Sequence, residues 1–263
     1  MYYEDCLKEA IKLLYEKNEF GAPVTDTLSV ISGNSGVQSA PNMGPSTSLH
    51  VLQIFHNSIR VLCNANTSEG FKPSKGASFP KIHLRTGEIT GLIGGSSPSS
   101  CSILAFFTGR LHGHIRLLLL EQWKNKNEDV QVYDSLSEGV SYNKMSKKNK
   151  YCLCQSGCKV ASPRVVKAIY AECVPVLISD HYVPPFSDIL NWKSFSVQIP
   201  VKDIANNKRI LMGISQTQYL RIHMKVKQVE KHFVGNGPPK RFDVFHMTLH
   251  SIWLIRLNIH VGN

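Results

Sequence analysis

YCLCQSGCKVASPRVVKAIYAECVPVLISD, residues 151–180, is the stretch that decides the fold. An apolar run over 151–154 leads through a turn of small residues to Ser162-Pro163-Arg164, and a second apolar run starts at Val174. Serine is a favoured N-cap, and proline fits the first helical position. The pattern therefore predicts a strand, a turn, a helix that begins at Pro163, and a second strand.

The N-terminus of this expected helix is suited to an anion. The first N–H groups of a helix lack intrahelical partners and carry partial positive charge, and Arg164 adds a full charge. We expect such an end to bind a phosphate or diphosphate. Capped helices are also common in α/β domains, so a purely structural role fits the same local pattern.

Apolar segments and helical patterns alternate along the rest of the chain. Short runs rich in β-branched and aromatic residues predict strands at 59–63, 103–107, 130–133, 151–154, 174–178 and 195–199. Helical patterns cover 115–123, 163–171, 201–214, 216–233 and 242–257. Ser215 and Gln218 form a capping box for the fourth of these helices. This order predicts an α/β fold with a Rossmann-like, mostly parallel sheet that binds ligands beyond the carboxyl ends of its strands.

Composition restricts the class of protein. Hydrophobic residues make up 42% of the 263 residues, which is enough for a real core. The longest aliphatic run, Leu117–Leu120, is too short to span a membrane, and the first residues show no signal-peptide pattern. A net charge of +11 would suit a protein that binds nucleic acid. The basic cluster at 144–150, however, is accompanied by neither an RNA-binding aromatic signature nor zinc-finger spacing. We therefore expect no nucleic-acid partner.

Three segments are expected. Residues 1–21 show one apolar face and predict an amphipathic helix. Residues 22–55 are rich in Ser, Gly, Pro, Thr and Asn, which is typical of a low-complexity linker. Residues 56–263 then form one ligand-binding lobe.

Longer stretches of the chain carry a family resemblance. From about Ile59 to the C-terminus, roughly three quarters of the sequence, the chain resembles the plant exostosin-like proteins of glycosyltransferase family 47. The resemblance rests on IRVLCNANTSEGF (59–71), TGLIGG (90–95), LAFFTGRLHGHIR (104–116), EDVQVY (128–133), GVSY (139–142), KYCLC (150–154), ASPRVV (161–166), VPVLISDHYVPPFSDILNWKSFSV (174–197) and PPKRFDVFHMTLHSIW (238–253).

This resemblance implies the C-terminal, donor-binding lobe of a two-lobed GT-B glycosyltransferase. Such an enzyme transfers a sugar from a nucleotide-diphosphate donor to a cell-wall polysaccharide or glycan in the Golgi, and needs no cofactor beyond the donor. The implied partners are the nucleotide sugar and the polysaccharide acceptor. Most of the acceptor lobe would have to come from elsewhere, for instance from another glycosyltransferase chain.

The residues expected at the donor follow from the same resemblance and from the strand ends. Ser156, Gly157, Ser162 and Arg164 are expected at the diphosphate, with Arg116 opposite them. Asp180 follows the strand at 174–178 and is expected at the same edge of the sheet. The sequence assigns no catalytic residue.

Two further residues expected at the donor, Lys159 and Lys167, depart from the family pattern, which has glutamates eight positions apart in their place. A carboxylate accepts hydrogen bonds from sugar hydroxyls, whereas lysine offers donors only. One such bond contributes about 1.5–3 kcal/mol. The alternatives are therefore a catalytically dead nucleotide-binding pseudoenzyme, a partner subunit of a transferase, or a decayed gene product that folds poorly.

Other residue groups carry weaker signals. Cys152, Cys154 and Cys158 match no common zinc spacing and are expected to be core cysteines, although a thiolate site stays open. His246 and His250 have the i, i+4 spacing of metal ligands but lack the intervening glutamate of the zincin motif, which favours buried or capping histidines. We predict no metal site. Asn66 begins an N-glycosylation sequon.

Overall fold

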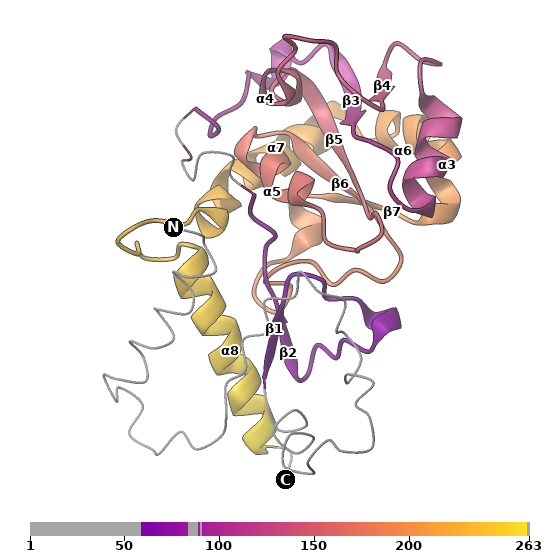
Figure 1. Ribbon diagram of the computed structural model, residues 1–263. Helices are drawn as coiled ribbons and strands as arrows, with labels where there is room; N and C mark the ends of the chain where they lie inside the picture. Colours follow the sequence, from indigo (N-terminus) through magenta and orange to yellow (C-terminus); the bar gives the residue numbers. More distant parts are fainter. Residues whose placement is uncertain (1–58, 84–88, 90, 262–263) are drawn as a thin grey trace. The chain divides into compact units, whose positions relative to one another are not determined.

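The computed structural model of this chain describes residues 59–83, 89 and 91–261. The helix and linker predicted at 1–21 and 22–55 lie outside these residues. The described residues belong to two compact units, so the stretch predicted as a single lobe contributes to both (Figure 1). We call Lys81–Tyr182 with Leu190–Val234 the sheet unit, and Met1–Pro80 with Val183–Ile189 and Gly235–Asn263 the α8 unit.

The sheet unit contains a five-stranded sheet in which every pairing is parallel. In spatial order the strands are β4 (Val130–Tyr133), β3 (Ile103–Thr108), β5 (Asn149–Gln155), β6 (Val174–Ile178) and β7 (Val197–Ile199). The central strands β5 and β6 are buried along almost their whole length. Their continuous apolar sequences are typical of a parallel sheet covered on both faces. This confirms the predicted Rossmann-like α/β fold.

Helices pack against this sheet and against one another. They are α3 (His114–Trp123), α4 (Tyr142–Ser146), α5 (Pro163–Tyr170), α6 (Asn207–Met212) and α7 (Gln216–Val229). α5 contacts β5, β6 and α7. The buried hydroxyl of Tyr170 donates a hydrogen bond of 2.6 Å to the carbonyl of Phe233, and the indole of Trp123 donates one of 2.9 Å to the carbonyl of Ile204. These bonds satisfy the polar ends of two large buried side chains.

Some predicted elements differ from the observed ones. The helix expected at 201–214 is a 3-10 turn, η4 (Val201–Asn206), followed by α6, and α7 ends in another 3-10 turn, η5 (Glu230–Phe233). Such turns are frequent at helix ends because i to i+3 bonds tighten the last turn. The predicted capping box of α7, made by Ser215 and Gln218, is confirmed.

The last strand of the sheet is shorter than predicted. Two of the residues assigned to it, Phe195 and Ser196, lie outside β7 and directly follow the 3-10 helix η3 (Trp192–Ser194), while the strand itself starts at Val197. The ring of Phe195 packs on the ring of Trp192 with centroids 4.6 Å apart. Aromatic side chains buried in a turn therefore gave the same apolar signal as a strand.

The α8 unit contains a parallel pair, β1 (Arg60–Leu62) and β2 (Gly76–Ser78), and the helix α8 (Val244–Val261). Because β2 consists of small residues without apolar alternation, sequence patterning missed it. Ser78 donates a hydrogen bond of 2.7 Å to the carbonyl of Val183, which links two of the three segments of this unit. The side chain of Val183 packs against a buried cluster formed by Leu62, Ala65 and Phe71.

Asp243 caps the N-terminus of α8. Its carboxylate is 2% exposed and accepts hydrogen bonds from the backbone N–H groups of Phe245 (3.1 Å), His246 (3.2 Å) and Lys240 (2.8 Å). Burial raises the pKa of Asp243, but these bonds outweigh burial and hold it below its usual value. His246 and His250 are both exposed, which corrects the expectation of buried histidines, and Asp243 rather than a histidine caps the helix.

A disulfide that sequence spacing did not predict joins Cys152 of β5 to Cys173 directly before β6. Their Cα atoms lie 5.8 Å apart, as expected for neighbouring parallel strands. The bond removes Cys152 from any thiolate cluster, so the alternative of metal binding by Cys152, Cys154 and Cys158 finds no support. Within 59–83 and 91–261, no group of three or more His, Cys, Asp or Glu side chains is arranged to hold a metal ion. The helices of these described ranges are also too short or too polar to cross a membrane.

The C-terminus of α5 predicts a stabilising substitution. Glu172 has a left-handed backbone with φ of +51°, and the following N–H, from Cys173, bonds to the carbonyl of Ala168 at 3.0 Å. Glycine adopts this conformation without steric cost. We expect Glu172→Gly to raise the free energy of unfolding by about 0.5–1 kcal/mol, although it removes the 3.1 Å ion pair with Lys227. Urea denaturation measures the change. Asn125→Gly, at φ of +55°, is the matched control and should gain less, because asparagine tolerates this region. A loss of stability in Glu172→Gly would show that the ion pair outweighs the strain.

Glu230 predicts a pH dependence. Burial, and then the nearby charge of Glu172, raise the pKa of Glu230 from 4.5 to about 7, while Lys227 acts in the opposite direction. A raised pKa in the folded state means that stability is lost as the pH rises from about 4.5 through 7. We expect Glu230→Gln and the unmodified chain to be equally stable at pH 5. At pH 8 the variant should be the more stable by about 1 kcal/mol, allowing for solvent screening. Parallel urea titrations at both pH values test this, and a constant difference would contradict it.

Candidate functional site

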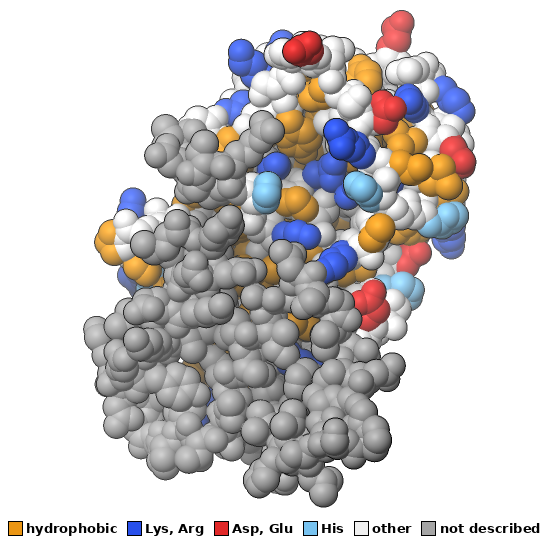
Figure 2. All heavy atoms as spheres, in the orientation of Figure 1, with side chains coloured by type: hydrophobic (Ala, Val, Ile, Leu, Met, Phe, Trp, Pro, Cys, Tyr) orange, Lys and Arg blue, Asp and Glu red, His pale blue; other side chains and the backbone are white. Residues whose placement is uncertain are grey.

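The loops that follow β3 and β5 meet at the carboxyl ends of these strands. Basic and histidine side chains gather on the face of the sheet unit that Figure 2 shows. In parallel α/β sheets this edge is where ligands bind. The sequence-predicted residues Arg116, Ser156, Gly157, Ser162 and Arg164 all lie in these loops or in the first turns of α3 and α5.

Arg164 ties the start of α5 to the end of β3. Its Nε and Nη2 atoms both donate to the carbonyl of Thr108, at 3.1 and 2.8 Å. Its guanidinium also lies over the ring of Phe107, with Cζ 4.9 Å from the ring centroid. A Cβ on Gly109 would clash with Nη2, so a larger residue here would displace the guanidinium from its place. Among the described residues the other N–H groups of this guanidinium form no hydrogen bond, so they can bind a ligand.

Arg116, in the first turn of α3, lies close to Arg164. Its Nη1 atom donates to the carbonyl of Arg110 at 3.3 Å, while its buried Nε atom has no partner among the described residues. Burial, and then the charge of Arg164, lower the pKa of Arg116. Two guanidinium groups are thus held together although they repel each other, and an anion between them would relieve both the repulsion and the unpaired N–H.

Two glycines allow this close approach. Gly113 has φ of +84°, and a Cβ there would lie 2.8 Å from the backbone N of Cys158 and 2.8 Å from the carbonyl carbon of Gly157. A Cβ on Gly157 would in turn lie 3.0 Å from Nη2 of Arg116. The loops after β3 and β5 therefore pack backbone against backbone, and the guanidinium of Arg116 lies against Gly157.

The small residues of the turn mainly build its shape. Ser156 donates from Oγ to the carbonyl of Val160 at 3.0 Å, and the N–H of Gly157 donates to the carbonyl of Lys159 at 3.0 Å. The side chain of Ser162 accepts the N–H of Arg164 at 3.3 Å and so caps α5 as predicted.

The backbone of α5 offers less to an anion than the sequence suggested. Pro163 has no N–H, the N–H of Arg164 bonds to the cap, and the N–H of Val165 bonds to the carbonyl of Ser162 at 3.2 Å. This corrects the expectation of free N–H groups at the helix start. The positive potential of the site therefore comes from the arginine side chains.

Lys167 lies one turn along α5 from Arg164, and its Nζ atom is 5.5 Å from the ring centroid of Tyr142. Burial raises the pKa of Tyr142 to about 12, and Arg164 acts in the opposite direction. The tyrosine is therefore neutral at physiological pH and serves as an aromatic support for the lysine. Sequence reasoning missed Tyr142 because α4, which begins with it, has only 5 residues.

Asp180 and Asn66 have partners away from the arginine pair. The carboxylate of Asp180 accepts the N–H of Val201 at 3.0 Å and so joins the end of β6 to η4. Asn66, in the α8 unit, is 6% exposed, and its Nδ2 atom donates to Glu69 at 2.9 Å. Because that nitrogen would carry a glycan, modification of Asn66 would have to precede folding.

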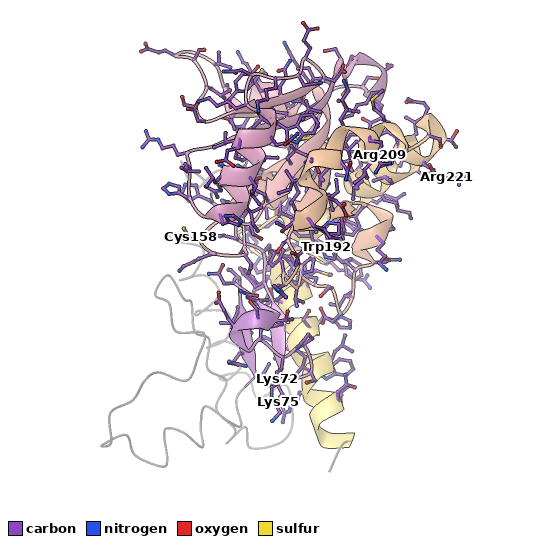
Figure 3. The ribbon with its side chains drawn as sticks, turned by 90° about the vertical axis from the view of Figure 1, so that its right-hand side faces the viewer. Lys72, Lys75, Cys158, Trp192, Arg209 and Arg221 are labelled. Carbon is purple, nitrogen blue, oxygen red and sulfur yellow. A yellow bond between two sulfur atoms is a disulfide. The ribbon has the colours of Figure 1, made fainter. Side chains whose placement is uncertain are left out.

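Cys158 is exposed, which corrects the expectation that it is a core cysteine. Among the described cysteines outside the disulfide it is exposed, Cys63 is partly buried, and Cys101 and Cys154 are buried. The backbone N of Cys158 lies against Gly113, so this cysteine adjoins the loop that carries Arg116. Figure 3 shows Cys158 at one side of the sheet unit.

Comparisons with known proteins agree with this geometry. A profile of the exostosin GT47 domain matches residues 38–214. A probable glycosyltransferase of Arabidopsis thaliana is 55% identical over 231 residues, which cover 88% of this chain and 45% of that protein. A second one is 42% identical over 267 residues, covering 95% of this chain and 56% of the relative. A probable beta-1,4-xylosyltransferase of the same plant is 27% identical over 132 residues, covering 49% and 32%. The chain thus spans about half the length of the more similar relatives.

The close packing of Gly113 on Gly157 predicts a difference between two substitutions. Gly113 and Gly139 both have positive φ, +84° and +81°, but a Cβ on Gly139 would meet nothing within 4 Å. We expect Gly139→Ala to lower the free energy of unfolding by about 1–2 kcal/mol through backbone strain alone. Gly113→Ala should cost about 2–4 kcal/mol, because the clash with the loop after β5 is added. Urea denaturation measures both, and equal costs would show that the two loops do not pack as described.

Proposed function

Because this chain belongs to the exostosin GT47 family of glycosyltransferases, we propose that it carries the donor-binding part of such an enzyme. In this proposal a sugar passes from a nucleotide-diphosphate donor to a cell-wall polysaccharide or other glycan, in the Golgi. The donor is the substrate, and no separate cofactor takes part. The acceptor side of the reaction belongs to residues outside the described part of this chain or to a partner transferase.

One observation carries the proposal: the repelling pair Arg116 and Arg164 at the carboxyl ends of parallel strands. Both side chains are held in place without a carboxylate, Arg116 by the carbonyl of Arg110 and Arg164 by that of Thr108. Arginine forks suit phosphate oxygens, which accept two parallel N–H bonds. A donor diphosphate placed here supplies the missing negative charge.

The same pair would assist the chemical step. In sugar transfer the bond between the anomeric carbon and the phosphate oxygen breaks, and negative charge develops on the departing diphosphate. Donors that are already fixed stabilise this charge without reorganising. Arg116 and Arg164 would therefore act on the leaving group, while the group that removes the acceptor proton has no assignment.

A nucleotide-binding chain without turnover, acting as a partner subunit, is the second candidate. Lys167 favours it, because its ammonium lies over Tyr142 where the family resemblance implies a carboxylate. Lys159, in the loop before α5, also stands where the family resemblance implies a carboxylate. Lysines attract the diphosphate but do not accept hydrogen bonds from sugar hydroxyls.

A ligand-dependent shift in stability tests the proposed site. We expect millimolar UDP to raise the thermal unfolding midpoint, since a ligand at about one hundred times its Kd adds about 2.7 kcal/mol. Arg116→Met should abolish the shift, and the fold should tolerate it because the mutation also removes the repulsion from Arg164. Arg209→Met on α6 loses the same charge and should keep the shift; Figure 3 shows Arg209 well apart from Cys158.

The outcome separates the candidates. A cooperative transition that UDP does not move would contradict both of them. When UDP binds, hydrolysis of UDP-sugars measured on the same sample distinguishes a transferase from a binding subunit.

A further inference from the structure

We propose that the exposed face of α6 and α7 binds the surface of a membrane that carries anionic lipids. In this contact the cations of the face meet the lipid headgroups, and its methionines enter the boundary between headgroups and acyl chains. The face belongs to the sheet unit, and Figure 3 shows two of its arginines on the side away from Cys158. Its residues are Arg209, Met212, Leu220, Arg221, Met224 and Lys225.

Large apolar side chains are exposed on this face. Met212 is 63% exposed and Met224 59%, the two highest values among the large hydrophobic residues that the structure describes. Leu220 lies one helical turn before Met224 and is also exposed, so the two share one face of α7. Met212 ends α6, and three steps along the chain, about 11 Å at most, lead to the N-cap of α7. Apolar side chains gathered in this way mark an interaction site.

Cations lie on the same face. Arg221 and Lys225 are exposed, one turn apart on α7, and each directly follows one of the two exposed apolar residues of that helix. Arg209 is exposed and precedes the methionine that ends α6 by three residues, so it shares the face of that methionine. Residues 204–229 contain no aspartate or glutamate. The face therefore combines apolar and positively charged side chains without an acid of its own.

Two acids reach these helices from other elements, and both bind lysines beside the face. Asp129, directly before β4, pairs with Lys208 at 2.6 Å. Glu172, after α5, pairs with Lys227 at 3.1 Å. These carboxylates therefore compensate lysines other than the cations of the proposed surface.

The cations of the face itself keep their charge uncompensated. Among the described residues, the guanidinium groups of Arg209 and Arg221 form neither a hydrogen bond nor an ion pair. Lys225 donates a hydrogen bond of 2.9 Å to the side chain of Gln228, which is neutral. An anionic partner would be complementary to these three charges.

This combination fits a lipid surface better than a soluble polyanion. Single-stranded nucleic acids gain from aromatic platforms on which bases stack. Within 204–229, which the structure describes throughout, the aromatic rings are those of Tyr219 and His223, and both are buried. Exposed methionine and leucine gain little from a soluble polyanion, whereas at a membrane surface they are buried among lipids while cations attract the anionic headgroups. Unbranched methionine also adapts to an irregular surface.

Cosedimentation of the full chain with vesicles tests the charged residues. Vesicles of phosphatidylcholine with an equal amount of phosphatidylserine should bind the chain at least about tenfold more tightly than pure phosphatidylcholine vesicles. Arg209→Gln with Arg221→Gln should weaken this binding about 25-fold, because each cation near an anionic bilayer contributes about fivefold. The matched control, Lys72→Gln with Lys75→Gln, removes the same charge from two exposed residues of the α8 unit that Figure 3 labels. It should leave binding nearly unchanged. Since all four side chains are exposed, urea denaturation should show unchanged stability.

Methionine oxidation tests the apolar part of the contact. Hydrogen peroxide should oxidise Met212 and Met224 more slowly when anionic vesicles are present, as peptide mapping of the full chain would show. Polygalacturonate, a soluble polyanion, should not slow the oxidation. Met212→Ser with Met224→Ser should weaken vesicle binding about tenfold, because less apolar surface enters the membrane.

Each other result would overturn the inference. Binding to neither kind of vesicle would do so, and an equal loss in the arginine variant and its control would assign binding to net charge. Vesicle binding with unchanged oxidation of both methionines would show that the apolar side chains stay in water. Protection by polygalacturonate equal to that by vesicles would identify a soluble polyanion as the partner. The shift of the unfolding midpoint by UDP should persist in Arg209→Gln with Arg221→Gln, so the proposed function is tested separately.

Discussion

The site depends on one contact, in which Arg164 places two N–H donors on the carbonyl of Thr108. Thr108 is the last residue of β3. Arg164 satisfies that carbonyl and thereby fixes the first turn of α5 against the neighbouring strand. Gly113 and Arg116 follow β3 in the chain, and Lys167 lies on α5. The attachment of α5 to β3 therefore fixes these residues relative to one another.

Arg164 in the first turn of α5 opposes the helix macrodipole, whereas Lys167 in the last turn complements it. Glu172 follows the C-terminus, where the helix is already negative. At the C-terminus Lys227 compensates, through its ion pair with Glu172. At the N-terminus the described residues that shift the pKa of Arg116 are another arginine and a thiol, not a carboxylate. A bound anion would supply the missing negative charge. The lack of a carboxylate beside Arg116 therefore supports a phosphate ligand more strongly than the helix cap does.

Family membership gives the class of enzyme, whereas the residues of this chain show which side chains can contact a ligand. The match to the exostosin GT47 domain and to plant glycosyltransferases places this chain in a transferase family. The aligned part covers only about half of the length of these relatives. What this chain's own residues add is a pair of arginines, Arg116 and Arg164, at the carboxyl ends of β3 and β5.

The sequence by itself determined the parallel α/β sheet, most strand and helix positions, the caps at Ser162 and Ser215, and the family. These features depend on local periodicity and capping chemistry, which adjacent residues carry. Only the tertiary structure decided that Cys152 pairs with Cys173, that Gly76–Ser78 forms a strand, and that Gly113 packs on Gly157. It also decided that the N–H groups at the start of α5 are taken and that Arg164 binds a carbonyl. Each of these is a contact between segments distant in sequence, or a choice among hydrogen-bond partners, and neither leaves a periodic signal in the chain.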